Sequence, residues 1–425
     1  MASEAPRDPE PTVTRIVGMS FTQPSRPRAL SIVLCCTLLL AATAADSQRP
    51  RERAASPRLY EIAGDFVRLD PETLHPVRGQ RAPLGSDSWA WSFAPGRDRI
   101  ALVSDSPGPE LRLIDLRTMG VIGDARLARR GSAWATAWVS SRRLLGVVVT
   151  RADDTLVAGV DSTTRRVVWR RTLGGSLRVG EAFHNGLVLI LGPHRDVGPS
   201  RLVRVTAGGG IRSASLEGIR SGSVSPLDSR PGLAIDHSEA RAFVVQAGAP
   251  VAEVDLRTLQ VHEHPLLLGG RAPDATTGAT RDALWLGKGL LAVTGWDIRS
   301  SGGATPAGLT LVNTLTWSAR KIHRRATHAM VWHYTLLASS FPYPGRGTLG
   351  SGLTGYSLAG ERKFHRYGHE PVAGVQPLGS KVLVMTPRRT TLIDVRTGRE
   401  LRRYRRLRFG TPVVGDRSFP PTADG

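Results

Sequence analysis

The sequence predicts an all-β fold built from repeated four-stranded units. An apolar strand that ends in Asp or Asn, followed by two variable residues and Thr, recurs along the chain at a spacing near 45 residues. Apolar runs of strand length lie between the copies, and no helical periodicity separates them. A repeat of this length is that of a four-stranded propeller blade, so we expect a β-propeller of seven or eight four-stranded blades.

The repeated motif predicts a hairpin turn rather than a catalytic carboxylate. Its copies are Asp70–Thr73, Asp115–Thr118, Asp161–Thr164, Asp255–Thr258, Asn313–Thr316 and Asp394–Thr397, with weaker ones at Thr206 and Ser357. An Asp or Asn side chain accepts backbone N–H bonds two residues further on, and Thr supports the same turn. Gly398, directly after Thr397, is expected to take the left-handed conformation that such turns require.

The blade count depends on how the two ends of the chain are used. Seven complete units fit between residues 86 and 404. Three further strands are predicted near Arg58–Ile62, Asp65–Leu69 and His75–Val77, and Thr411–Val414 can supply a fourth. Joining both ends in one blade would close the ring and remove its exposed edges, which favours eight blades. Seven blades with an extra hairpin is the alternative.

The N-terminal region has the layout of a secretory signal peptide. Residues Ala29–Ala42 are apolar, follow Arg26 and Arg28, and lead into the small-residue site Ala42–Ala44. The apolar stretch is shorter than the about 20 residues that a membrane span needs. We therefore expect cleavage near Ala44 and a secreted or envelope-associated protein with no membrane span in the mature chain. An uncleaved N-terminal anchor is the alternative, and Met19 is a possible start.

These boundaries divide the chain into four parts. Residues 1–45 are the predicted signal peptide with an extended n-region, and 46–56 form a short linker. Residues 57–416 make the propeller, and 417–425 are predicted to be a disordered tail. The sequence does not indicate an oligomeric state.

The chain is strongly basic, with a formal net charge of +21 that comes almost wholly from arginine. The arginines are scattered rather than gathered on one element with stacking aromatics, which argues against nucleic acid as the partner. An anionic polymer of the cell envelope remains compatible with this charge.

One repeat resembles a known family of propellers. Ala158–Trp169, read AGVDSTTRRVVW, resembles the tryptophan-docking repeat of quinoprotein-like propellers, and Asp394–Leu401 is similar without the tryptophan. The strand-Asp-x-x-Thr-Gly pattern is also similar to YVTN and WD40-like propellers. The quinone-dependent dehydrogenases of this family use an adjacent cysteine pair and a calcium site. Here the pair is Cys35 and Cys36 in the signal peptide, so no cofactor is expected.

No catalytic or metal-binding motif stands out in the mature part of the chain. His262 and His264 lie two residues apart, so both would point to one face of an outer strand. Two such histidines are more common as surface residues than as metal ligands, and no metal site is predicted.

The candidate ligand-binding residues lie on long connections between the second and third strands of three units. These connections, at Gly192–Ser200, Trp296–Gly308 and Phe341–Gly352, would emerge on one face of the ring. Long loops on a rigid scaffold are where binding residues concentrate. The candidates are His194, Arg195, Trp296, Asp297, Arg299, Phe341, Tyr343 and Arg346.

Two classes of function follow from these observations. The first is an exported, non-enzymatic propeller that binds a protein, a glycan or an anionic envelope polymer through the long-loop face. The alternative is a propeller enzyme, such as a hydrolase, lyase or dehydrogenase, whose site at the mouth of the central channel has no contiguous motif. Clustered histidines and acids at the channel would favour the enzyme.

Overall fold

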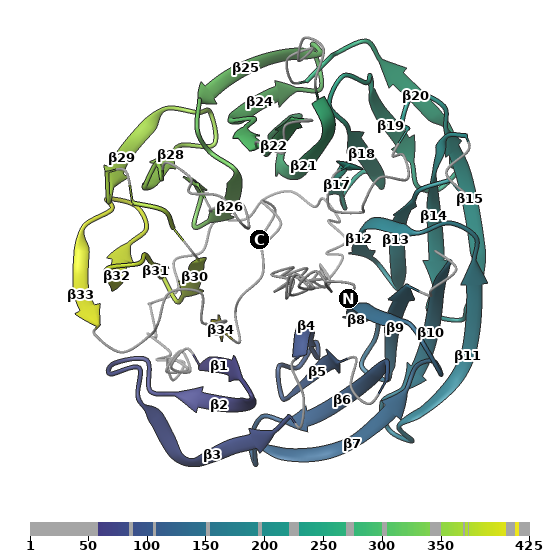
Figure 1. Ribbon diagram of the computed structural model, residues 1–425, viewed down its shortest axis with the longest axis vertical. Coiled ribbons are helices and arrows are strands. Elements are labelled where there is room, and N and C mark those ends of the chain that lie inside the picture. Colours follow the sequence, from purple (N-terminus) through teal and green to yellow (C-terminus); the bar gives the residue numbers. More distant parts are fainter. Residues whose placement is uncertain are drawn as a thin grey trace, which may run out of the picture.

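The protein is an eight-bladed β-propeller in the computed structural model (Figure 1). The structure describes residues 58–84, 88–104, 108–149, 154–193, 198–220, 229–268, 276–299, 304–340, 350–368, 370–372, 374–404 and 413–415. Eight sheets of at least four strands form a ring, which confirms the predicted fold class and the larger of the two blade counts. No helix among these residues is long and apolar enough to cross a membrane. The predicted signal peptide, linker and tail all lie outside the described residues.

We number the blades 1 to 8 in chain order. Blade 1 contains β1 (Leu59–Ala63), β2 (Asp65–Leu69), β3 (Pro76–Pro83) and β34 (Val413–Gly415). Blade 2 contains β4 (Ser88–Phe93), β5 (Arg99–Ser104), β6 (Glu110–Asp115) and β7 (Gly120–Arg126). Blade 3 contains β8 (Ser132–Trp138), β9 (Arg143–Val149), β10 (Thr155–Asp161) and β11 (Arg166–Leu173). Blade 4 contains β12 (Leu177–Phe183), β13 (Gly186–Leu191), β14 (Ser200–Thr206) and β15 (Ile211–Leu216).

The second half of the ring follows the same order. Blade 5 contains β17 (Gly232–Asp236), β18 (Arg241–Val245), β19 (Val251–Asp255) and β20 (Val261–His264). Blade 6 contains β16 (Ser229–Arg230), β21 (Thr276–Gly287), β22 (Leu290–Arg299), β23 (Ala304–Pro306), β24 (Leu309–Asn313) and β25 (Ser318–His323). Blade 7 contains β26 (His328–Trp332), β27 (Thr335–Ser339), β28 (Leu353–Tyr356) and β29 (Arg362–Arg366). Blade 8 contains β30 (Gly374–Leu378), β31 (Lys381–Met385), β32 (Thr390–Asp394) and β33 (Glu400–Tyr404).

The ring closes through both ends of the described chain. β34, near the C-terminus, pairs antiparallel with β1, with Leu59 opposite Gly415 and Glu61 opposite Val413. β34 therefore becomes the innermost strand of blade 1, as expected; Thr411 lies outside the described residues. The hydrophobic core consists of eight clusters of buried side chains, and each cluster fills the interface between two neighbouring blades.

The repeated motif forms the predicted turns. In the copy at Asp161, Oδ1 accepts hydrogen bonds from the backbone N–H groups of Thr163 and Thr164 at 3.0 and 2.8 Å. The same pair of bonds occurs in all six strong copies, including the one that begins with Asn313. These Asp and Asn side chains therefore hold the connection between the third and fourth strands of six blades.

The tryptophan-docking arrangement is present at the repeat that suggested it. Trp169 packs flat over Gly159 of its own blade, where an added Cβ would lie 2.3 Å from the indole. Its Nε1 donates a hydrogen bond to the carbonyl of Ala207 in blade 4 at 3.0 Å. Phe364 in blade 7 has an equivalent position, because it covers Gly355 of its own blade and Gly398 of the next. Glycine leaves room for the ring in both places.

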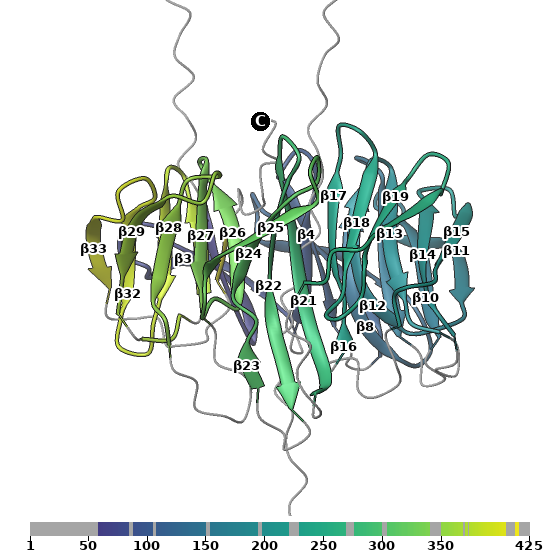
Figure 2. The same ribbon diagram turned by 90° about the horizontal axis from the view of Figure 1, so that it is seen from above.

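Blade 6 departs from the regular blade. Its first two strands, β21 and β22, have 12 and 10 residues. The short strand β23 pairs antiparallel with the end of β22, from Trp296 to Ile298. The two-residue β16 pairs in parallel with β21. Viewed from the side, the far ends of β21, β22 and β23 project beyond the ring (Figure 2). We call this projection the ledge and define it as residues 276–282, 295–299 and 304–306.

Candidate functional site

The ledge contains part of a segment that the sequence predicted to be a loop. Trp296 and Ile298 are buried in β22 and pair with Thr280 and Gly278 of β21, so the prediction of a loop beginning at Trp296 was wrong. The alternation of buried apolar residues explains the difference, because it continues the strand beyond the body of the blade. At Gly295, φ is +142°, and an added Cβ would meet a carbonyl oxygen of β21 at 2.0 Å. This position therefore requires glycine.

A buried arginine that the sequence reading missed holds the ledge together. The side chain of Arg281 is 1% exposed, and its Nη2 lies 2.6 Å from Oδ1 of Asp297. Its Nη1 donates to the carbonyl oxygens of Thr280 and Trp296, both at 2.9 Å. A buried guanidinium is tolerated only when its charge is paired and its N–H groups are hydrogen-bonded, and this geometry meets both conditions.

The predicted binding residues are thus only partly placed. Trp296 is packed in β22, and Asp297 is engaged by Arg281 with 24% of its side chain exposed. Arg299 is the last residue of β22, opposite Thr276. The other candidates lie outside the described residues, namely His194, Arg195, Phe341, Tyr343 and Arg346. The proposal that these residues bind a ligand therefore stays a prediction.

A pocket of about 350 Å³ opens between blades 5 and 6 on the face opposite the ledge, where the hairpin turns lie. From blade 5 it is lined by the β17–β18 turn and Arg241, and from blade 6 by Trp285, the turn at Lys288 and Leu315. We call it the turn-face pocket. Its size lies at the lower end of the range for small-molecule sites.

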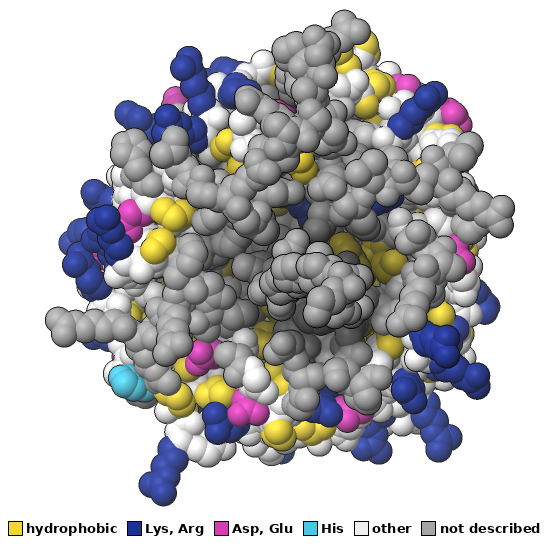
Figure 3. Space-filling view, viewed as in Figure 1, with side chains coloured by type: hydrophobic (Ala, Val, Ile, Leu, Met, Phe, Trp, Pro, Cys, Tyr) yellow, Lys and Arg dark blue, Asp and Glu magenta, His cyan; other side chains and the backbone are white. Residues whose placement is uncertain are grey.

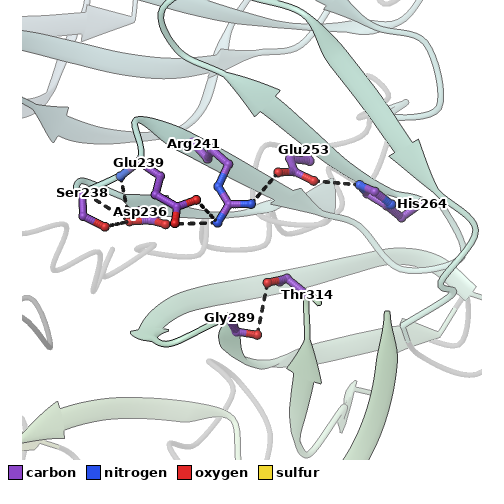
Figure 4. Close-up of polar contacts among 8 residues, drawn as sticks. All are labelled: Asp236, Ser238, Glu239, Arg241, Glu253, His264, Gly289 and Thr314. Atoms are coloured by element: carbon purple, nitrogen blue, oxygen red, sulfur yellow. Dashed lines mark hydrogen bonds and ion pairs between the residues drawn. The ribbon is translucent and has the colours of Figure 1, made fainter. Parts of the chain in front are cut away.

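One guanidinium organises the polar wall of this pocket (Figure 4). Nη2 of Arg241 lies 2.5 Å from Glu239 and 3.4 Å from the buried Asp236, and its Nη1 lies 3.0 Å from Glu253. Glu253 in turn contacts Nε2 of His264 at 2.9 Å. Burial opposes the charge on Arg241, but the bond to Glu253 and the neighbouring carboxylates outweigh it and raise the pKa of Arg241. Arg241 is therefore charged and lies within ion-pair distance of three carboxylates.

His264 has a structural explanation that the sequence could not supply. Its ring stacks on Trp317 of blade 6, with centroids 3.4 Å apart, while it contacts Glu253. His262 lies two residues away on the same outer strand and is exposed. Within the described residues, no group of three or more His, Cys, Asp or Glu side chains is arranged to hold a metal ion.

A second polar group lies one blade away, on the other side of the same β17–β18 turn. Glu181 of β12 lies 3.9 Å from Nε2 of His237, and the ring of His184 lies 6.4 Å from that of His237. Although 31% of the Glu181 side chain is exposed, the surrounding protein desolvates it and raises its pKa, which the contact with His237 only partly offsets. Desolvation also lowers the pKa of His184, and the charge of His237 adds to this shift. A carboxyl group with a raised pKa beside histidines is a candidate for proton exchange.

Sequence reasoning missed Arg281, Arg241 and Glu181 because their partners come from other strands. Arg281 and Asp297 are 16 residues apart, and Arg241 collects carboxylates from a turn and from the next strand. The one available signal was a charged residue within an otherwise apolar strand pattern. That pattern marks a buried charge but does not identify its partner.

Comparisons with known proteins support the fold and no more specific relationship. No family model matches the sequence, and no curated protein matches it. Among solved structures, the chain is similar to dihydro-heme d1 dehydrogenase NirN, with a TM-score of 0.58 and 12% identity over 84% of this chain and 75% of NirN. It is also similar to AztD from Citrobacter koseri, with a TM-score of 0.53 and 13% identity over 85% and 97% of the two chains.

A yeast protein gives the same result. Sqt1 from Saccharomyces cerevisiae has a TM-score of 0.52 and 8% identity over 74% of this chain and 84% of Sqt1. These proteins include an enzyme and proteins not named as enzymes, so the shared propeller does not decide between catalysis and binding.

Proposed function

We propose that the protein is an exported, non-enzymatic propeller that binds a protein, glycan or anionic polymer of the cell envelope through the ledge face. The observation that supports this most is the ledge itself. It extends one blade of an otherwise regular ring and is held by the ion pair between the buried Arg281 and the partly exposed Asp297. Burying a charge pair gives little or no net stability compared with apolar side chains, so the fold alone does not require it.

A shortened variant tests this proposal. Trp296 and Pro306 face each other across β22 and β23, so residues 297–305 can be replaced by Asn-Gly, a two-residue hairpin turn. The variant also carries Arg281→Met, because the guanidinium would otherwise lose its partner. The matched control keeps the full-length ledge and carries Arg281→Met alone, which leaves Asp297 in place.

The measurement is capture from envelope extract by chains that begin at Asp46, with bound molecules identified by mass spectrometry. We expect the unmodified chain and the control to retain a common partner that the shortened variant loses. Equal retention by all three chains would contradict binding through the ledge. Export is tested separately by cell fractionation and N-terminal sequencing, which should find a mature chain that starts just after Ala44.

A second candidate, a propeller enzyme, is supported by one observation: the raised pKa of Glu181 beside His237. In this case Glu181 would act as a general acid and His237 as its partner. A panel of chromogenic ester, glycoside and lactone substrates tests it. Any turnover should disappear in Glu181→Gln and persist in Glu239→Gln, a carboxylate of the neighbouring pocket.

A further inference from the structure

Exposed cations gather on the outer strands of blades 6 and 7, β25 and β29, and on the two residues that follow β25. They are Arg320, Lys321, Arg324, Arg325, Arg362, Lys363 and Arg366. We call these seven residues the basic belt. β25 and β29 are neighbours on the rim, since Nη2 of Arg320 donates to the carbonyl of Ala359 in the turn before β29 at 2.7 Å. Dark blue side chains mark this part of the rim at the upper left of Figure 3.

The charge of the basic belt is not neutralised. Among the described residues, no carboxylate lies within ion-pair distance of any of the seven, although ion pairs do form elsewhere on the rim, such as Arg403 with Glu400. Cations on an outer strand protect its free edge from pairing with other chains. That role does not explain the uneven distribution, because the outer strand of blade 5, Val261–His264, contains one Glu, two His and no Lys or Arg.

The belt combines fixed and available donors. Arg320 and Arg366 are held in place by main-chain carbonyls of the following blade, and Lys363 donates to the hydroxyl of Thr335 at 3.2 Å. The remaining four side chains form no hydrogen bond or ion pair with another described residue. They are Lys321, Arg324, Arg325 and Arg362. Free guanidinium groups match phosphate oxygens in a bidentate geometry.

We propose that the basic belt binds a linear polyanion that carries repeated phosphate groups. The charge density selects an anionic chain. The strands β25 and β29 carry no exposed Phe, Tyr or Trp, which favours contact with phosphates over bases, although Tyr334 beside Lys363 has an exposed side chain. Phe364 is the aromatic residue of β29 and is buried, and β25 contains no Phe, Tyr or Trp. Single-stranded nucleic acid is normally held by exposed aromatic rings that stack on its bases. This inference does not depend on the ledge.

The test compares two variants that lose the same charge. The belt variant carries Lys321→Gln, Arg324→Gln, Arg325→Gln and Arg362→Gln. The control carries Arg129→Gln, Arg130→Gln, Arg142→Gln and Arg166→Gln, which are exposed and scattered over blades 2 and 3. Thermal unfolding midpoints establish that both variants are folded, since exposed substitutions of this kind have small effects on stability. Affinity for inorganic polyphosphate is measured from about 50 to 200 mM salt.

We expect the belt variant to lose at least about tenfold in affinity. The slope of log affinity against log salt concentration should become shallower by about three, because each phosphate contact releases a counterion. The control should stay within about twofold of the unmodified chain, since it lacks only diffuse charge. Equal losses in both variants, or no binding to polyphosphate at about 150 mM salt, would overturn the proposal.

Two further ligands separate the sources of phosphate. Tighter binding to oligothymidine than to polyphosphate would overturn the proposal in favour of nucleic acid. Retention on phosphatidylglycerol vesicles without polyphosphate binding would overturn it in favour of a membrane surface. The chain with the shortened ledge should keep its full affinity for polyphosphate, so failure of the ledge proposal and failure of this one are distinguishable.

Discussion

At the scale of single residues, the turn motif uses a left-handed position that is seldom glycine. The residue after Thr has a φ between +50° and +70° in all six strong copies, and it is Leu74, Met119, Arg165, Leu259, Trp317 or Gly398. A left-handed non-glycine residue costs about 1–2 kcal/mol. The larger apolar side chains among them pack against the core between their own blade and the preceding one, which offsets that cost.

The turn carboxylates give the first prediction. We expect Asp161→Ala to destabilise the protein by about 1–2 kcal/mol, because the backbone N–H groups of Thr163 and Thr164 lose their acceptor. Asp161→Asn should be nearly neutral at pH 7, since Asn313 forms the same bonds in blade 6. Urea unfolding followed by tryptophan fluorescence measures both. A loss in the Asn variant equal to that in Ala would refute the hydrogen-bond explanation.

The desolvated Glu181 gives a prediction about pH. Because its pKa is raised in the folded state, the folded protein binds this proton more tightly than the unfolded chain does. Stability from this group is therefore present below its ordinary pKa and is lost as the pH rises through the raised value. We expect Glu181→Gln to be more stable than the unmodified chain at neutral pH and to lose this advantage near pH 4. Thermal melts across this range measure the difference.

At the scale of elements, blades 7 and 8 are joined by one aromatic ring that fits against two glycines. Phe364 lies against Gly355 in its own blade and against the turn glycine of blade 8, where an added Cβ would be 2.4 Å from the phenyl ring. The other five strong copies of the motif place a side chain at this turn position, whereas blade 8 leaves the space to Phe364. The glycine at 398 is thus required by its neighbour more than by its backbone conformation.

A double-mutant cycle tests this explanation. Gly398→Ala should destabilise the protein by more than the about 1–2 kcal/mol of a left-handed alanine, because the methyl group collides with Phe364. Phe364→Ala alone should cost about 3–5 kcal/mol through loss of a buried ring. In the Phe364→Ala background, Gly398→Ala should destabilise the protein only by the about 1–2 kcal/mol of a left-handed alanine. Denaturant unfolding of the four proteins gives the difference between the two costs as a coupling energy. Strict additivity would show that the collision is not the cause.

At the scale of the whole molecule, the arginines have a structural use that composition did not indicate. Arg212, Arg320 and Arg366 on outer strands each donate to main-chain carbonyls of the following blade. Part of the +21 charge therefore joins blades together. The arginines of the basic belt without such bonds are the ones that can serve a partner.

The sequence predicted the ring better than the site. The repeats were visible because each blade needs a turn between strands, and such a turn is formed by residues adjacent in the sequence, as at Asp394. The ledge was hidden because the strand that contains Trp296 is followed by Gly-, Ser- and Pro-containing sequence typical of loops. The network around Arg241 was hidden because its carboxylates come from a turn and a separate strand. The pattern of neighbouring residues predicts turns and strands. Which side chains meet across two strands depends on the register of their pairing, which this pattern does not specify.

The closure of blade 1 gives the last prediction. A chain that ends before β34 should keep seven intact blades but leave β1 without its inner partner and Val413 missing from the core between blades 8 and 1. We expect a lower unfolding temperature and faster amide hydrogen exchange confined to blades 1 and 8. Exchange that rises equally in every blade would show that the ring melts as one unit.

Because β1, the first described strand, pairs with β34, the last, the ring cannot be completed until all eight blades have been synthesised. Up to that moment the first three strands form an incomplete sheet with an unsatisfied inner edge. An unfinished or truncated chain therefore exposes the edge of β1, which β34 covers in the finished molecule. Chaperones and proteases that recognise extended backbone can distinguish the two by that edge alone.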